Sequence, residues 1–346
     1  MRVLARRARE TGAKPLIAAV VAIAVAAFAA TASHAEEVTI GVLNTTSTAP
    51  VFLALDRGYF QAEGLQPKIV TFDSAQPVAL GVVSRDLDFG VTGLTSAFFS
   101  LAGQGALKIV AGAYSEHRGF HYNAFVASKR ASAAGLIALK QLPGHSFALS
   151  QIGSPPHYAI GAVADKLGFD LKSLRLLPLQ SIPNQVSAIV GGQADAAMLQ
   201  ASVVLPLLDR GDAKLLGWLS DEISWQLGVA FTSTKTADGK AEFVRRTLRA
   251  IARGRGDYVD AFIGPDGSLK FGPTSAAVLD LIAKHLDQAP DQVKLGLLYM
   301  DKAGRLDETD ILRQIAWYKA HGMLKPEIDG AAMIDKRYVV ALPAGE

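Results

Sequence analysis

The chain alternates short apolar runs with segments of helical spacing from residue 38 to residue 111. The apolar runs, at residues 38–43, 68–72, 87–91 and 106–111, have the length and β-branched content of buried strands. The segments between them carry helix signals, such as Pro50 in a first turn and Gly58 as a stop. Strands that alternate with helices predict a parallel sheet with helices on its faces, and therefore an α/β fold.

A second set of strands and helices repeats this plan further along the chain. The expected strands are residues 145–150, 174–179, 194–199 and 214–219. Each half contains a helix end, a turn, an acid and a strand in this order, with Asp88 as the acid in the first half and Asp195 in the second. We interpret both acids as partners in turn or strand-edge hydrogen bonds, with ligand contact as the alternative. The repeat predicts two similar lobes.

Two extended segments, near residues 124–128 and 225–232, are expected to carry the chain from one lobe to the other and back. The predicted division is a discontinuous lobe of residues 36–124 and 228–346, and an inserted lobe of residues 125–227. After the second crossing the pattern becomes helical, at residues 240–262, 274–286, 290–300 and 308–321. We expect this helical C-terminal region to pack mainly on the first lobe.

The first 35 residues have the order of a secretory signal peptide: a basic start, an apolar run and small residues at the end. We predict cleavage near Ala35 and export to the periplasm. An uncleaved anchor is the alternative, but the apolar run is shorter than a membrane span. These residues hold five of the 35 basic residues and one of the 32 acidic residues, so the rest of the chain is nearly neutral. No basic stretch follows, which argues against nucleic-acid binding.

Polar residues follow the expected strands at the ends where open α/β sheets bind ligands. In the first lobe these candidates are Asn44, Thr46, Ser47, Thr92, Gly93, Thr95 and Ser96. Hydroxyls and backbone N–H groups at a helix N-terminus suit an anionic group, and ordinary helix capping is the alternative. In the second lobe, Ser154 is expected as a helix N-cap, and His157 follows in the first turn. Solvent exposure is the alternative for His157.

Charged residues and histidines gather in residues 112–123. Arg118 is placed to hold a carboxylate or sulfonate with two hydrogen bonds, and a surface ion pair with Glu116 is the alternative. His117 and His121 are four residues apart, but no third ligand is evident, so we expect no metal site.

Aromatic and amide side chains complete the set of candidates. Tyr114 and Trp225, together with Tyr122, are placed to form flat apolar walls around a ligand, and ordinary core packing is the alternative. Gln200 follows the expected strand at residues 194–199, and it is the corresponding candidate in the second lobe.

Three segments resemble a known family. Residues 49–65, with the sequence APVFLALDRGYFQAEGL, are similar to the first helix of periplasmic binding proteins for nitrate, taurine, alkanesulfonates and thiamine-pyrimidine precursors. Residues 86–93 and 153–158 resemble cleft motifs of the family's two lobes. The resemblance covers nearly all of the chain after residue 38. It implies a two-lobed periplasmic binding protein fold of type II, whose members deliver ligand to an ABC permease. Just after the second lobe's Asp strand, the family often has tryptophan or another large residue, whereas this chain has Gln200, Ala201 and Ser202.

The predicted function is a monomeric periplasmic solute receptor for a small organic anion, a sulfonate or carboxylate with an alkyl or aromatic body. It would deliver this ligand to an ABC permease and ATPase, without a cofactor, a metal or a catalytic residue. A pyrimidine-type thiamine precursor is the alternative ligand. An enzyme on the same fold and a sensor subunit are the alternative functions. The family's enzymes, sulfinate desulfinases and the pyrimidine synthase of thiamine biosynthesis, carry functional cysteines, and this chain has no cysteine.

Overall fold

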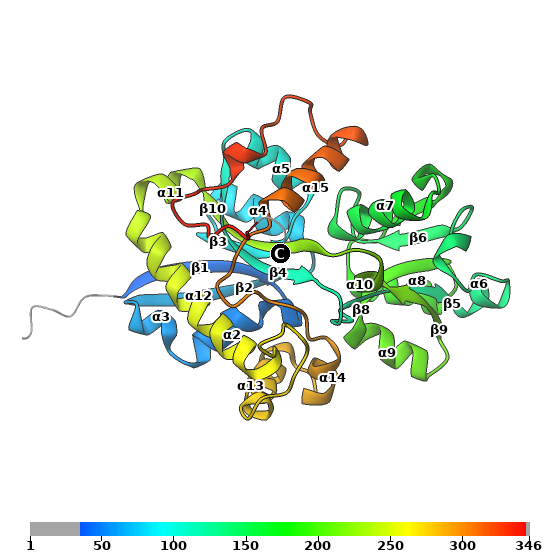
Figure 1. Ribbon diagram of the computed structural model, residues 1–346, viewed down its shortest axis with the longest axis horizontal. Coiled ribbons are helices and arrows are strands. Elements are labelled where there is room, and N and C mark those ends of the chain that lie inside the picture. Colours follow the sequence, from blue (N-terminus) through cyan, green and yellow to red (C-terminus); the bar gives the residue numbers. More distant parts are fainter. Residues whose placement is uncertain (1–34, 344–346) are drawn as a thin grey trace, which may run out of the picture. The chain divides into compact units, whose positions relative to one another are not determined.

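The computed structural model describes residues 35–343 and contains two five-stranded sheets (Figure 1). The first sheet has the order β2-β1-β3-β10-β4, with β1 (Glu36–Leu43), β2 (Leu65–Phe72), β3 (Phe89–Gly93), β4 (Leu107–Glu116) and β10 (Trp225–Ser233). The second has the order β7-β6-β8-β5-β9, with β5 (Asn123–Ser128), β6 (Ser146–Leu149), β7 (Arg175–Pro178), β8 (Ala196–Gln200) and β9 (Ala213–Trp218). From Glu37 onward, the described residues belong to one compact unit that holds both sheets.

The two sheets have the same topology. Strand β1 pairs in parallel with β3, as β6 does with β7 and β8. Strand β10 is antiparallel to β3 and β4, and β5 is antiparallel to β8 and β9. The α/β fold is therefore confirmed, and the predicted parallel pairing is found between β1 and β3 and between β6 and its neighbours β7 and β8. Both crossing segments are themselves strands, and each pairs antiparallel inside a sheet. The lobe boundaries at residues 124 and 228 stay a prediction.

Helices cover both faces of the first sheet. Helices α2 (Ala49–Asp56), α3 (Tyr59–Ala62) and α12 (Ala241–Phe262) pack on one face, and α4 (Ala75–Ser84), α5 (Ser96–Gly103) and α15 (Glu308–Ala320) pack on the other. Successive side chains of a strand point to opposite faces. Accordingly, Ala230 belongs to the apolar cluster under α2 and α12, whereas Phe231 belongs to the cluster on the α5 side. Gly254 lets α12 approach α2, because a Cβ there would lie 2.1 Å from the carbonyl oxygen of Pro50.

The second sheet is covered in the same way. Helices α6 (Lys129–Ala133) and α7 (Pro155–Leu167) lie on one face, and α8 (Ile182–Val190) and α9 (Ala201–Asp209) lie on the other. The remaining helices are α10 (Leu219–Glu222), α11 (Thr234–Gly239), α13 (Ser275–Leu286) and α14 (Pro290–Leu295), with short 3-10 turns at Thr46–Thr48, Leu139–Gln141, Leu171–Ser173 and Ala331–Met333. Helix α14 ends at Leu295, five residues earlier than expected, and contacts α9. The C-terminal helices therefore touch elements of both sheets.

The paired acids of the repeat have the structural role that we expected. The Asp88 carboxylate accepts hydrogen bonds from the backbone N–H of Thr39 at 2.9 Å and from its hydroxyl at 3.0 Å. Asp195 accepts the same two bonds from Ser146, at 2.9 and 2.8 Å. In both cases the partners are 49 residues apart. Each acid ties the start of its own strand to the neighbouring parallel strand.

The predicted signal peptide, residues 1–35, lies almost entirely outside the described residues. Across residues 35–343, none of the helices has both the length and the apolar character that a membrane crossing requires.

Candidate functional site

Three neighbouring cavities lie where strand ends of the first sheet face loops of the second. Their volumes are about 100, 230 and 740 Å³, and Asp73 borders all three. We call the space that they share the cleft. The smallest cavity is lined from the first sheet's side by Thr45, Ser47, Asp73, Ser74, Gly93, Tyr114 and Leu227, and from the second sheet's side by Ser150, Pro155, Gln185, Met198 and Gln200. The cleft therefore takes residues from both halves of the repeat.

Hydroxyl groups form the cleft wall at the end of β1. The hydroxyl oxygens of Thr45 and Ser47 are 2.8 Å apart, at hydrogen-bond distance. Tyr114 on β4 lies beside them, and its ring packs against Gly228, where a Cβ would come within 2.2 Å of a ring atom. Burial raises the pKa of Tyr114, against the opposing effect of polar contacts with Ser47 and Thr92. This phenol therefore stays protonated and uncharged.

Tyr122 lies between the two walls of the cleft. Burial raises its pKa to about 12, although polar contacts with Thr45, Ser47 and Gln200 act in the opposite direction. Its backbone carbonyl accepts the N–H of Ala201, the first residue of α9, at 2.8 Å. This bond ties the segment before β5 to the segment after β8. The aromatic wall of the cleft is therefore neutral and able to form hydrogen bonds.

Gln185 on α8 brings an amide into the cleft. Its Nε2 donates to the carbonyl of Ser181 at 3.2 Å, and the side chain is 2% exposed. Its Oε1 is buried and has no hydrogen-bond partner among the described residues. A buried acceptor without a donor is costly, so a ligand that donates a hydrogen bond here would be favoured.

The cleft carries little charge. Asp73 is the one charged residue among the described residues that line the three cavities, and it is exposed. No lysine or arginine lines them. Helix α4 begins at the cleft, because its N-cap Ser74 and its first residue Ala75 both border the smallest cavity. Ser74 makes no side-chain capping hydrogen bond, so the N–H groups of this first turn provide the cleft's partial positive charge.

The structure brings part of the predicted set together. The predicted residues that line the cleft cavities are Asn44, Thr46, Ser47, Gly93, Tyr114 and Gln200. The others, which line none of the three cavities, are Thr92, Thr95, Ser96, Arg118, Ser154, His157 and Trp225. The ligand-binding roles of all thirteen stay predictions.

The start of α5 is occupied by contacts within the protein. The Thr95 hydroxyl accepts the N–H of Phe98 at 3.0 Å, which is the ordinary capping bond that we gave as the alternative. The N–H of Ser96 donates to the carbonyl of Gly153 at 2.9 Å. These two groups are therefore engaged at the positions where an anion was expected.

The start of α7 is also a packing site. Ser154 is the N-cap residue, as predicted, with a proline in the first turn. His157 is 3% exposed, and its Nδ1 accepts the N–H of Gly153 at 2.9 Å. Burial, with the neighbouring His321 acting in the same direction, lowers the pKa of His157 to about 4. The alternative of solvent exposure is therefore wrong for His157. Trp225 is also buried, and it stacks on Tyr158 with ring centres 4.8 Å apart.

Arg118 is exposed and forms no ion pair with any described residue. The alternative that we gave, a surface pair with Glu116, is wrong because Glu116 is 1% exposed. Its carboxylate accepts the side-chain amide of Asn123 at 2.7 Å and the backbone N–H of the same residue at 3.3 Å. Burial raises the pKa of Glu116 to about 8, and the two bonds from Asn123 partly offset this effect.

The two histidines of this loop have separate aromatic partners. His117 stacks on Tyr299 with ring centres 4.3 Å apart, and His121 stacks on Trp218 at 4.6 Å. Within residues 35–343, no group of three or more His, Cys, Asp or Glu side chains is placed to hold a metal ion.

Sequence reasoning missed several residues that line the cleft. Asp73 and Ser74 follow the strand that ends at Phe72, so the rule that selected Asn44 would also have selected them. Asn123 lies beside Tyr122 at the start of β5. Gln185 carried no signal, because an amide within a helix is ordinarily a surface residue.

Comparisons with known proteins found a matching family model and similar folds. A family model described as NMT1/THI5 like matches residues 45–261, which is more than half of the chain. No curated protein matches the sequence. Among solved structures, the alkanesulfonate-binding protein SsuA from Xanthomonas axonopodis pv. citri, bound to MOPS, is 18% identical with a TM-score of 0.68, and the match covers 86% of this chain and 98% of that one.

Two further solved structures have similar folds. The periplasmic nitrate-binding protein NrtA from Synechocystis PCC 6803 is 11% identical with a TM-score of 0.65, and the match covers 86% of this chain and 84% of that one. A mutant of DSZB in complex with biphenyl-2-sulfinic acid is 12% identical with a TM-score of 0.59, and the match covers 89% and 97% of the two chains. The chain therefore has the periplasmic binding protein fold, and the predicted resemblance is confirmed.

Proposed function

Because the chain belongs to the NMT1/THI5-like family, we propose that it is a periplasmic solute receptor that delivers a small molecule to an ABC importer. The fold, the cleft between the two sheets and the likeness to an alkanesulfonate-binding protein and a nitrate-binding protein support this proposal. The importer would consist of a permease and an ATPase. Export would follow from the signal-like order of residues 1–35, and the receptor would act as a monomer.

The ligand that the cleft favours is a small uncharged ring compound that donates hydrogen bonds. The unpartnered Oε1 of Gln185 is the observation that carries this choice, because a ligand N–H or O–H would satisfy it. The exposed carboxylate of Asp73 is a second acceptor. Tyr114 and Tyr122 provide flat surface and neutral hydroxyls for the ring. An aminopyrimidine has these features, and it corresponds to the alternative ligand class that we gave from the sequence.

A small organic anion is the second candidate. The alkanesulfonate-binding and nitrate-binding structures favour it, and so does the start of α4, where free N–H groups border the cleft. The absence of lysine and arginine from the cavity lining weighs against it, since anion sites without a cation depend on these N–H groups alone.

A thermal-shift screen of the purified protein tests the proposal. The panel contains a hydroxymethyl-substituted aminopyrimidine, an alkanesulfonate of matched size, an aromatic carboxylate and nitrate. A cleft ligand at about 100 times its dissociation constant stabilises the folded state by about 2.7 kcal/mol, which moves the melting temperature by several degrees. We expect the aminopyrimidine to give the largest shift. A shift from the anions alone would favour the second candidate, and no shift from any compound would count against the receptor.

An incubation with each stabilising compound separates binding from catalysis. The product mixture is examined by mass spectrometry after prolonged contact with the protein at high concentration. A receptor returns the compound unchanged, whereas an enzyme on the same fold converts it. Loss of uptake in a strain that lacks the gene then distinguishes an import receptor from a sensor subunit, because a sensor would leave uptake intact.

A further inference from the structure

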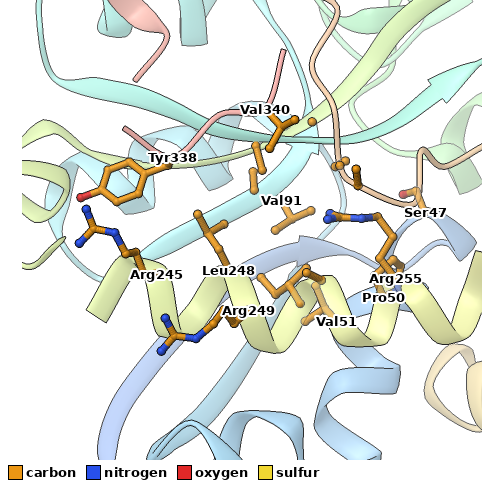
Figure 2. Close-up of a pocket in the computed structure, with 18 of the residues that line it drawn as sticks. Ser47, Pro50, Val51, Val91, Arg245, Leu248, Arg249, Arg255, Tyr338 and Val340 are labelled. Atoms are coloured by element: carbon orange, nitrogen blue, oxygen red, sulfur yellow. The ribbon is translucent and has the colours of Figure 1, made fainter. Parts of the chain in front are cut away.

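A second cavity, of about 310 Å³, lies between α12 and the first sheet, and we call it the α12 cavity. Figure 2 shows its lining side chains, with Arg245 and Tyr338 at one end and Arg255 and Ser47 at the other. Its volume falls at the lower end of the range of small-molecule sites, about 300–1,000 Å³. Ser47 also lines the cleft, so the two spaces are neighbours.

The α12 cavity extends along α12, and apolar side chains line its middle. Arg245 and Arg255 are ten residues apart on one helix, which corresponds to about 15 Å along the helix axis. Between them α12 presents Leu248, Ile251 and Ala252 to the cavity. Val91 on β3 is on the opposite wall. This shape fits a linear alkyl chain better than a compact ring.

Arg255 places a buried positive charge at the inner end of the cavity. The residue is 6% exposed, and its guanidinium extends from α12 into the space shown in Figure 2. Its Nε donates to the carbonyl of Lys302 at 3.2 Å, and no described residue accepts a hydrogen bond from its two terminal nitrogens. The guanidinium also lies against Gly304, where a Cβ would come within 2.4 Å of a terminal nitrogen.

The acid next to Arg255 is bound to another residue. Asp301 is near enough to interact with Arg255 through space, but its carboxylate accepts from the backbone N–H of Arg305 at 2.9 Å and from its Nε at 2.8 Å. Burial lowers the pKa of Arg255, a sign that its charge lacks full compensation from the protein. A buried guanidinium whose two terminal nitrogens donate to no described residue is a strong binding group for a carboxylate.

All charged residues that line the α12 cavity are arginines. Besides Arg255 they are Arg245, Arg249 and Arg337, and none of the described lining residues is acidic. The other three have partners: Arg245 lies over the ring of Tyr338, Arg249 pairs with Glu63 and Glu242, and Arg337 pairs with Asp335 and Asp238. Arg255 is therefore the buried arginine among the four, and none of the described acids forms an ion pair with it.

We propose that the α12 cavity is a second ligand site, separate from the cleft, that binds a medium-chain carboxylate. The carboxylate pairs with the terminal nitrogens of Arg255, and the alkyl chain lies along Leu248, Ile251 and Val91 toward the end marked by Arg245. The proposal does not depend on which molecule the cleft binds, because it uses no residue that gives the cleft its ligand preference.

Titration calorimetry with octanoate and with octanol tests this site. The protein should bind octanoate, and octanol should bind about tenfold or more weakly because it lacks the charge that pairs with Arg255. Arg255→Met should weaken octanoate binding by about tenfold or more and leave octanol binding nearly unchanged. The proposal is overturned if the protein does not bind octanoate, or if it binds octanoate as well with Met at position 255 as with Arg.

Arg253→Met is the matched control. Arg253 lies on the same helix but is exposed, and it stacks over the ring of Tyr59 at 3.9 Å outside the cavity. Its replacement should leave octanoate affinity unchanged, and an equal loss in both variants would overturn the assignment to Arg255. A second variant, Ala252→Leu, keeps Arg255 and fills the apolar part of the cavity. It should also weaken octanoate binding, and unchanged binding would overturn the proposed path of the chain.

A cleft variant separates the two sites. Gln185→Ala alters the cleft and lies outside the α12 cavity, so octanoate affinity should not change. If octanoate binding is lost in Gln185→Ala and kept in Arg255→Met, octanoate occupies the cleft and the second site is refuted. Failure of the aminopyrimidine to bind would affect the proposed function alone, because octanoate binding is measured independently.

Discussion

The backbone N–H of Ser96 donates to the carbonyl oxygen of Gly153 at 2.9 Å, and this bond joins the start of α5 on the first sheet to the loop before α7 on the second. Gly153 has a φ of +78°, and a Cβ there would lie 2.0 Å from the Ser96 hydroxyl oxygen. The hydroxyl of Tyr318 also donates to the Gly153 carbonyl, at 3.1 Å. The two halves of the repeat therefore meet at a point that accepts only glycine.

Gly153→Ala should destabilise the protein strongly. A left-handed backbone costs a residue with a Cβ about 1–2 kcal/mol, and the clash with Ser96 adds about 1–3 kcal/mol. Gly168 is the matched control, because its φ is +76° and nothing lies within 4 Å of the Cβ position. In urea unfolding, Gly153→Ala should lose more stability than Gly168→Ala. Equal losses of stability in the two variants would mean that the clash with Ser96 does not add to the cost of Gly153→Ala.

Glu116 should make stability fall as the pH rises toward neutrality and beyond. Burial raises its pKa to about 8 in the folded protein, from an ordinary value of 4.5. Between these two values the folded state keeps a proton that the unfolded state has lost. The contribution of Glu116 is therefore fully present below pH 4.5 and is lost as the pH rises through about 8, by up to about 1.4 kcal/mol per pH unit.

Unfolding free energies measured at about pH 6 and about pH 8 test this dependence of stability on pH. Glu116→Gln should flatten the decline, since glutamine does not titrate. The two proteins are compared by the slope of unfolding free energy against pH. Their absolute stabilities also differ, because the glutamine amide at position 116 alters the bonds to Asn123 at every pH. The exposed acid Glu327 supplies the control, and Glu327→Gln should keep the slope of the unmodified protein. An unchanged slope in Glu116→Gln would refute the assignment.

Asp195→Ala should cost stability through the second sheet. The substitution leaves the N–H of Ser146 without its acceptor, and an unsatisfied buried donor costs about 1–3 kcal/mol. Asp212 provides the comparison, because it pairs with Arg210 in a more exposed position and a surface pair is worth about 0–1 kcal/mol. Chemical denaturation of both alanine variants measures the difference. A loss no larger for Asp195 than for Asp212 would contradict the structural role.

The sequence predicted those features of the fold that residues close together in the chain determine. The matching positions of Asp88 and Asp195 predicted the repeat, and Ser154 followed by a proline predicted the start of α7. The place of β10 could not be predicted, because its partners β3 and β4 lie more than a hundred residues earlier in the chain. Long-range pairing of this kind leaves no local pattern.

Fewer of the site residues than of the fold elements could be predicted, because tertiary contacts decide their roles. A hydroxyl before a helix suits both a cap and a ligand contact, and tertiary contacts decide between them. Ser47 lines the cleft, whereas Thr95 caps α5. Gln185 became a candidate only once the structure showed its amide oxygen buried without a partner. The same holds for Arg255, which reads as one of several arginines on an amphipathic helix until its burial is known.

The most direct test of the cleft is titration calorimetry with the hydroxymethyl-substituted aminopyrimidine. Measurements on the unmodified protein and on Gln185→Ala are compared with Gln193→Ala, in which an exposed glutamine near the end of α8 is replaced. The account predicts one binding site, a loss of about tenfold or more in Gln185→Ala, and unchanged affinity in Gln193→Ala. Binding that is equally tight in all three proteins, or binding of sulfonates without any binding of the aminopyrimidine, would contradict it.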